Sequence, residues 1–185
     1  EKDSAEESRV LGRMVAECFR MPWIEENISD LLEAVGFSRR YVAAVRKVIP
    51  EYGPDWKSKI VLSNIFEKGG YNVFSIVAQS PDGQELSRRL SLQAYLEIVA
   101  ATNFKQRMRK MLEYYHADRM NYAVAGTPNR LEYDQGFFVK LGDGAADIKP
   151  IVHLYKSQVY QLAEYLGVPE DIIKRPPTTD TYSLQ

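Results

Sequence analysis

The feature that most constrains this chain is the run of polar residues and glycines between residues 126 and 156. A short apolar segment ends in a Gly-Thr pair at 126–127, and a carboxylate follows at Glu132. The sequence Gly-Phe-Phe-Val-Lys-Leu-Gly-Asp-Gly then occupies 136–144, with Asp147 and Lys156 soon after it. So many polar groups at the ends of strands and helices suit a nucleotide-phosphate site better than a packed core.

The periodicity of apolar residues predicts helices and strands in alternation. We expect helices over 5–20, 28–36, 39–48, 93–119 (broken near Thr102-Asn103) and 154–166, strands over 22–27 and 121–125, and a β-hairpin over 71–91. The alternation favours an α/β fold, with a parallel sheet flanked by helices and an inserted β-hairpin. Ligands of parallel sheets bind beyond the carboxyl ends of the strands, where the Gly-Thr pair falls.

Composition bounds the class of protein. A chain of 185 residues is long enough for one domain with a sizeable core. Its net charge of −1 gives no global field that would recruit nucleic acid, and no run approaches the roughly 20 apolar residues of a membrane span. A single cysteine, Cys18, excludes an internal disulfide and favours a reducing cytoplasm. We therefore expect a cytoplasmic protein that binds neither nucleic acid nor membrane.

Two residues are candidates for the phosphate end of a nucleotide site. Thr127 could offer its hydroxyl to a phosphate, although a threonine that caps a plain turn is the commoner explanation of a Gly-Thr pair taken alone. Glu132 is expected about one turn into the next helix, where its carboxylate would suit Mg²⁺, a cation that prefers oxygen ligands. The alternative for Glu132 is a solvated helix face, the usual place of a glutamate.

The segment that follows offers aromatic and charged candidates. Phe137 could stack on a flat heterocycle while Lys140 meets a phosphate or carboxylate, or both phenylalanines of the pair could belong to a core. Asp147 could hold a ligand or cap a turn. Lys156 opens a helix, where a lysine is unfavourable unless an anion compensates it, so a phosphate contact is plausible. Arg107 and Thr178 are further candidates for ligand contacts. Arg107 could instead be a solvent-exposed side chain, and Thr178 could belong to a plain loop.

In order and spacing these residues resemble the ammonia-dependent NAD⁺ synthetases. The resemblance covers about 103–185, and the pattern is specific because many positions agree in order. The agreeing positions are Asn103, Arg107, Arg109, Gly126, Thr127, Glu132, Gly136, Phe138, Lys140, Gly142, Asp143, Gly144, Asp147, Ile148, Pro150, Ile151, Leu154, Lys156, Pro177, Thr178 and Asp180.

The resemblance implies an adenine-nucleotide α-hydrolase-like, Rossmann-like fold and an ATP-pyrophosphatase mechanism. The carboxylate of nicotinic acid adenine dinucleotide (deamido-NAD) would attack the α-phosphorus of ATP, and ammonia would attack the resulting acyl-adenylate to give NAD⁺. Carried over by position, Arg107, Phe137, Lys140 and Asp147 would contact deamido-NAD. Thr127, Lys156 and Thr178 would contact ATP, Glu132 would ligate Mg²⁺, and Asp147 and Lys156 would act in catalysis. A homodimer is implied as well.

The chain also departs from the family pattern. The Ser-Gly-Gly-x-Asp-Ser loop that cradles the ATP pyrophosphate is absent, and the chain does not begin with methionine. We therefore expect a partial synthetase domain over 1–185 that is inactive as it stands. Residues 37–100 are longer than the usual connection, and this insert could be a lid, a dimer contact or a docking surface for an ammonia donor. No glutaminase module is visible, so ammonia would be free or supplied by a separate glutaminase or other donor.

Two other functions stay open at the level of sequence. The chain could belong to another ATP pyrophosphatase that amidates or thiolates a different substrate, such as a GMP-synthetase-like enzyme. It could instead be a non-catalytic module that binds a dinucleotide or a protein partner.

Overall fold

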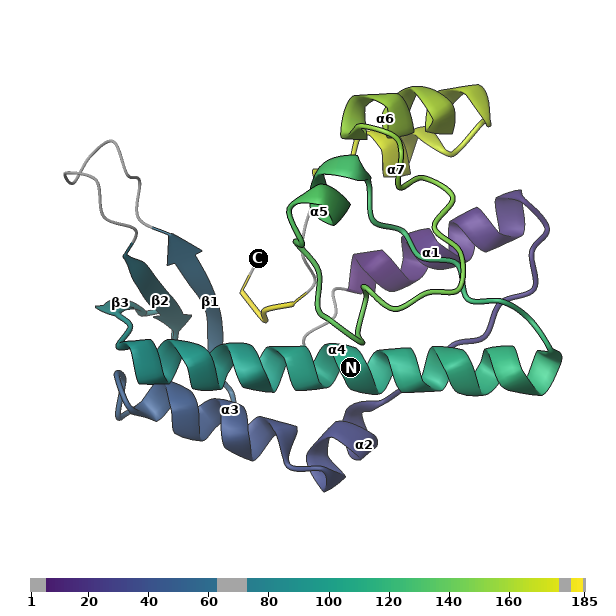
Figure 1. Cartoon of the computed structure of the whole chain (residues 1–185). Helices are drawn as coiled ribbons and strands as arrows, with labels where there is room; N and C mark the ends of the chain where they lie inside the picture. The colour runs from purple at the N-terminus through teal and green to yellow at the C-terminus, as the bar shows by residue number, and fades with distance from the viewer. Residues whose placement is uncertain (1–5, 63–72, 177–180, 185) are drawn as a thin grey trace. The chain divides into compact units, whose positions relative to one another are not determined.

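The computed structural model of the chain describes residues 6–62, 73–176 and 181–184. These residues form two compact units. The sheet unit contains 27–62, 73–102 and 181–184, and the helical unit contains 6–26 and 103–176. The long helix α4 (Leu92–Met120) contributes residues to both units (Figure 1). The expectation of a single partial domain with 37–100 as an insert stays a prediction.

The sheet unit is built on three antiparallel strands in the order β1-β2-β3. Strand β1 (Lys57–Leu62) pairs with β2 (Phe74–Gln79), and β2 pairs with β3 (Glu85–Arg89). The turn between β2 and β3 is closed by the Gly83 amide, which donates to Ser80 O at 3.0 Å, and Gly83 adopts a φ of +87°. The predicted hairpin is therefore confirmed, since glycine accepts this left-handed conformation without strain.

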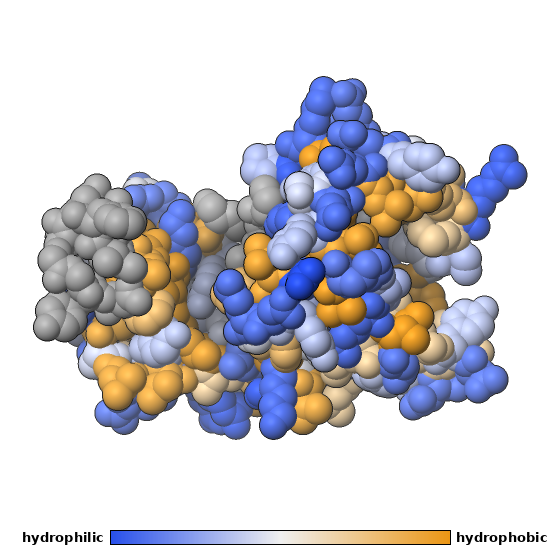
Figure 2. Space-filling model, turned by 45° about the horizontal axis from the view of Figure 1, so that its top comes forward, coloured by the Kyte–Doolittle hydropathy of each residue, from blue (hydrophilic) through white to orange (hydrophobic). Residues whose placement is uncertain are grey.

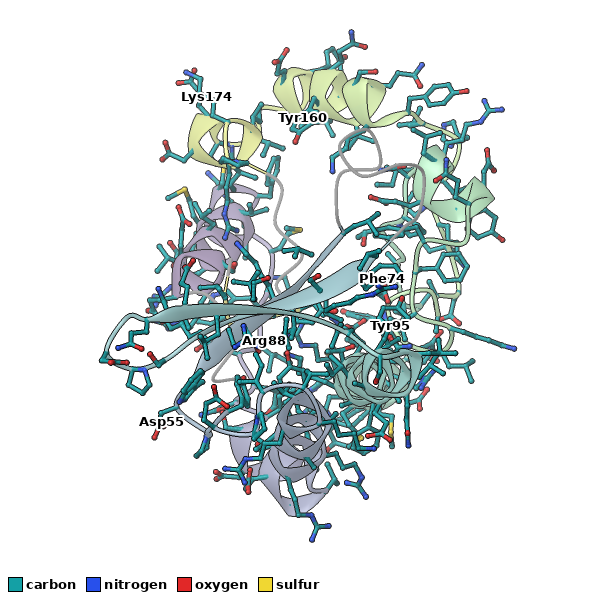
Figure 3. The ribbon with its side chains drawn as sticks, turned by 90° about the vertical axis from the view of Figure 1, so that its left-hand side faces the viewer. Asp55, Phe74, Arg88, Tyr95, Tyr160 and Lys174 are labelled. Atoms are coloured by element: carbon teal, nitrogen blue, oxygen red, sulfur yellow. The ribbon has the colours of Figure 1, made fainter. Side chains whose placement is uncertain are left out.

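The core of the sheet unit lies between one face of the sheet and two helices. Helix α3 (Phe37–Arg46) runs alongside the N-terminal half of α4, and α2 (Ser29–Ala34) precedes it (Figure 1). Phe74 of β2 stacks on Tyr95 of α4 with ring centroids 4.4 Å apart (Figure 3). The buried cluster contains Ala44, Val45, Ile49, Tyr52, Ile76, Ala78, Leu90, Ala94 and Ile98.

The helical unit combines α1 (Glu6–Cys18) and the second half of α4 with three shorter helices. These are α5 (Arg130–Asp134), α6 (Lys156–Tyr165) and α7 (Glu170–Ile173). Arg175 joins the end of α7 to α1 because its guanidinium donates to Ser8 Oγ at 3.0 Å and lies 3.5 Å from the Glu7 carboxylate. None of the described helices is long and apolar enough to cross a membrane.

Several sequence predictions need correction. Helix α4 is not broken near Thr102-Asn103, because the Thr102 hydroxyl donates to Ile98 O and Val99 O and is satisfied inside the helix. Residues 22–27 form no strand, and β1 was not expected. The strand over 121–125 is reduced to a parallel bridge between Ala125 and Ile148. The three named strands pair antiparallel, so this bridge is the one parallel pairing within the described residues. The parallel sheet that the sequence predicts is therefore not confirmed.

We expect Ile76→Ala to lower the free energy of unfolding by about 2–4 kcal/mol, because Ile76 is fully buried in the core of the sheet unit. Val77 lies next to it on the opposite face of the same strand and is half-buried, so Val77→Ala should cost about 1 kcal/mol or less. Urea unfolding followed by circular dichroism compares the two variants. Equal losses would show that this face of the sheet does not carry the core.

Candidate functional site

A short parallel pairing lies at the centre of the candidate site in the helical unit. The Gly126 amide donates to Ile148 O at 2.8 Å, and the amides of Asp147 and Ile148 donate to Val124 O at 2.9 and 3.3 Å. A Cβ atom on Gly126 would lie 2.7 Å from the Ala146 Cβ, so a side chain here would push the two segments apart. The pairing therefore fixes the backbone on either side of it, including Asp147 and the exposed Thr127 that follows Gly126.

The Asp147 carboxylate reinforces this pairing. Its Oδ2 accepts a 2.7 Å hydrogen bond from the Val124 amide, and its Oδ1 accepts one of 3.3 Å from the Tyr114 hydroxyl on α4. Loss of hydration around Tyr114 raises the pKa of its phenol, and the negative charge of Asp147 raises it further. Asp147 thus ties α4 to the paired segments, in addition to any role toward a ligand.

A reciprocal cap at the start of α5 holds the Glu132 side chain. The Glu132 amide donates to Asn129 Oδ1 at 3.1 Å, and the Asn129 amide donates to Glu132 Oε2 at 2.9 Å. Asn129 is 6% exposed, so the cap is shielded from water. Among the described residues nothing donates to Glu132 Oε1. One carboxylate oxygen therefore fixes the helix start while the other remains available to a cation.

Two contacts connect the start of α5 to the start of α6. The Arg130 amide donates to Leu154 O at 2.9 Å, and the Arg130 guanidinium lies 5.1 Å from the centroid of the Tyr155 ring. Lys156 is the first residue of α6, and its side chain is exposed. Thr127, Glu132 and Lys156 consequently lie on backbone segments that are joined to one another.

The loop 137–144 is held by a hydrogen bond from α4 and by hydrogen bonds within the loop itself. Arg107 of α4 donates through Nε to Lys140 O at 3.0 Å. Within the loop, Asp143 Oδ1 accepts a 2.8 Å hydrogen bond from the Val139 amide, and the amides of Gly142 and Gly144 donate to Val139 O at 2.9 and 3.1 Å. The Lys140 backbone is thereby fixed while its side chain remains exposed.

The two adjacent phenylalanines differ in environment. Phe138 is half-buried and stacks on Tyr133 with centroids 6.0 Å apart, and it packs so closely over Gly144 that a Cβ atom there would overlap its ring. Phe137 is 75% exposed. Apolar side chains also lie among charged ones elsewhere on the surface (Figure 2). Phe138 therefore belongs to the packing of the unit, and Phe137 is the ring that can meet a ligand.

The helical unit contains seven of the eight candidate residues, and Thr178 lies outside the described residues. Arg107 and Lys140 are in direct contact, whereas the others are related through backbone pairing and caps. Sequence reasoning missed the supporting roles of Tyr114 and Asn129; the Asn-x-x-Glu spacing could have indicated the second. No three or more His, Cys, Asp or Glu side chains gather into a metal site within the described residues.

Comparisons with known proteins agree on one family. The family model of NAD synthase matches residues 71–185. The NH₃-dependent NAD⁺ synthetase of Rhizobium meliloti (strain 1021) is 60% identical over 185 residues, which are all of this chain and 55% of the relative. That of Thermotoga maritima is 33% identical over 180 residues, 97% of this chain and 59% of the relative. This chain thus spans little more than half of the length of these curated relatives.

Among the solved structures, that of the NMN synthetase from Francisella tularensis aligns with part of the chain. The alignment covers 47% of this chain and 37% of that one, with 44% sequence identity and a TM-score of 0.45. The match to the Rhizobium relative includes residues 37–100, so that relative shares this region.

We expect Asp147→Asn to leave the free energy of unfolding within about 1 kcal/mol of the natural protein, because the amide oxygen can accept from the Val124 amide and the amide nitrogen can donate to Tyr114. Asp147→Ala should cost about 1–3 kcal/mol, since the Val124 amide loses its acceptor. Urea unfolding measures both. If alanine were tolerated as well as asparagine, the carboxylate would have no part in holding the pairing.

Proposed function

Because the chain belongs to the NAD synthase family, we propose that the protein catalyses the ATP-dependent amidation of deamido-NAD with ammonia, giving NAD⁺, AMP and pyrophosphate. The observation that carries the proposal is the family match over 71–185, the part of the chain that supplies most of the candidate site. The relatives described as NH₃-dependent NAD⁺ synthetases support the choice of ammonia as the nitrogen donor.

We assign the ATP contacts to Thr127, Lys156 and Thr178. The support for the first two is that their segments are joined through the Arg130–Leu154 hydrogen bond. Lys156 stands at the positive end of the α6 dipole, and a phosphate beside it would offset the repulsion. Its ammonium would also stabilise the charge that develops on ATP as pyrophosphate departs, which makes it a candidate catalytic residue.

Glu132 is the residue we assign to Mg²⁺. Proteins commonly hold this ion with one or two carboxylates, the remaining ligands being substrate phosphates and water. The uncommitted Oε1 of Glu132 fits that arrangement, because the ion requires no cluster of protein ligands. When bound, Mg²⁺ would neutralise charge on the ATP phosphates.

We assign deamido-NAD to the loop 137–144 and its neighbours. Arg107 uses Nε to hold Lys140 O, which leaves the terminal guanidinium nitrogens for an anionic group. The exposed ring of Phe137 can stack on the nicotinate ring, and Lys140 can contact a phosphate or carboxylate. Asp147 is the second candidate catalytic residue, placed to orient the substrate. Positioning would supply much of the rate, because the substrate carboxylate must meet the α-phosphorus of ATP in line.

In this reaction the carboxylate oxygen of deamido-NAD forms a bond to the α-phosphorus while pyrophosphate leaves. Ammonia then attacks the acyl carbon of the adenylate, AMP departs with the bonding electron pair, and ammonia loses a proton to leave the amide of NAD⁺. Activation is needed because a free carboxylate is a poor electrophile.

The family resemblance also supports finer features that we include in the proposal. They are a homodimer, ammonia that is free or supplied by a separate glutaminase or other donor, a cytoplasmic location, and a parallel sheet to which the Ala125–Ile148 bridge would belong. A substrate panel separates this function from that of a GMP-synthetase-like enzyme, because only deamido-NAD should support pyrophosphate release.

We expect Glu132→Gln in the protein at its natural length to slow deamido-NAD-dependent pyrophosphate release roughly a hundred-fold, the effect of losing about 3 kcal/mol of charge stabilisation. Glutamine can still accept the Asn129 amide, so the fold should be unchanged. Asp134→Asn is the matched control, because Asp134 is an exposed carboxylate of the same helix that pairs with Arg130. Normal pyrophosphate release by Glu132→Gln would refute the metal assignment.

A further inference from the structure

Leu141, in the loop 137–144 of the helical unit, combines two features that do not stabilise the chain. Its backbone has a φ of +61°, in the left-handed region that residues with bulky side chains rarely adopt, because the Cβ atom approaches the following carbonyl oxygen. Its side chain is 69% exposed. A single exposed leucine needs no explanation, but a left-handed leucine does, and such backbone strain is found most often where a protein binds a ligand.

Helix termination does not account for the conformation of Leu141. Among the residues that the structure describes, the other non-glycine residues with a positive φ are Arg20 and Asn121, which follow α1 and α4. After each of them, the next amide donates to a carbonyl five positions back, at 2.7 and 2.9 Å, which is a usual way to end a helix. Leu141 follows no helix and therefore needs another reason.

The turn that contains Leu141 favours a glycine at its position. The Gly142 amide donates to Val139 O at 2.9 Å, so residues 139–142 form a β-turn with Leu141 as the third residue. A positive φ at this position is usually supplied by glycine or asparagine. The glycine that follows serves a different purpose, because a Cβ atom on Gly142 would lie 3.0 Å from Val139 Cγ1. The local structure thus gives no reason for a leucine at residue 141.

The residues around Leu141 indicate what its side chain contacts. Lys140 is exposed, and its carbonyl accepts a 3.0 Å hydrogen bond from Arg107 Nε, so two cations lie beside the turn. Phe137, on the same loop, is 75% exposed. Cations beside exposed apolar side chains suit a ligand that carries negative charge together with a flat ring. The turn and the bond from Arg107 also fix the backbone of Leu141 before any ligand binds.

We propose that Leu141 is a binding residue for deamido-NAD and makes an apolar contact with one of its flat rings. The proposal rests on the proposed function, which assigns this ligand to the loop 137–144 but gives no role to Leu141. Apolar area that the ligand covers at residue 141 would offset the cost of the left-handed backbone. The contact recognises the shape of the ligand, because a leucine side chain forms no hydrogen bonds.

Two truncations test the contact in the protein at its natural length. Leu141→Ala and Leu141→Gly both remove the apolar group, so the dissociation constant for deamido-NAD, measured by calorimetry without ATP, should rise roughly five- to twenty-fold in each. Leu141→Met keeps an apolar side chain of similar size and should bind within about two-fold of the natural protein. The affinity for ATP should be unchanged in all three. Leu92→Ala is the control, because Leu92 is a 74% exposed leucine of the sheet unit.

Thermal unfolding separates the loss of binding from a change in the fold. Glycine adopts a positive φ without strain, so Leu141→Gly should melt roughly 1–4 °C above Leu141→Ala in the absence of ligand. The two variants should nevertheless lose the same affinity for deamido-NAD. If affinity followed stability instead, so that the glycine variant bound as tightly as the natural protein, Leu141 would act only through the fold and the proposed contact would be wrong.

The outcomes also distinguish this inference from the proposed function. If the natural protein amidates deamido-NAD and Leu141→Ala binds it equally well, the inference alone fails; a change in oligomeric state in that variant would then assign the side chain to a protein contact. If the natural protein binds deamido-NAD without amidating it, and both truncations weaken binding, the inference stands and the proposed reaction fails. If the natural protein does not bind deamido-NAD, both fail.

Discussion

The pairing of Val124 and Gly126 with residues 147–148 is the contact on which the rest of the helical unit depends. It closes the chain between residues 126 and 147 into a loop whose ends cannot separate. Closure lowers the number of conformations open to α5 and to the loop 137–144, both of which lie inside it. The approach is close because Gly126 has no side chain, and the Asp147 carboxylate secures it by binding the Val124 amide.

Sequence signals that act over short distances predicted much of the fold. The Ser-Pro-Asp-Gly turn located the hairpin, and Gly167, which adopts a φ of +73°, marked the end of α6. Strand β1 was missed because its Lys-Ser-Lys start is polar and carries no strong strand signal. The break expected near Thr102 was wrong because a threonine hydroxyl can bond to the preceding turn of its own helix.

The candidate site could be named from sequence, but the contacts that hold it could not. The order of residues pointed to Asp147, whereas its partner Tyr114 lies 33 positions away and has no motif of its own. Ser58, whose amide donates to Ser183 Oγ, lies 125 positions before that residue. Hydrogen bonds between such distant residues depend on tertiary packing, which a single sequence does not display. Of the supporting contacts, only the cap between Asn129 and Glu132 could have been predicted from the sequence, because it follows a local spacing rule.

Glu132 and Asp147 each combine a structural hydrogen bond with an expected contact to a ligand. A substitution that removes the whole side chain changes both properties at once. Amide replacements retain the structural hydrogen bond and remove the charge, which allows the two contributions to be separated.

The two edges of the three-stranded sheet are protected in different ways. Strand β3 ends in Arg88 and Arg89, whose charges oppose the approach of another strand, and Figure 3 shows Arg88 on this edge. The edge of β1 is instead covered by residues 183–184. Cleavage of the chain just before residue 181 would therefore uncover the backbone of β1 and create a template for intermolecular strand pairing. Aggregation of the protein would then begin at this edge.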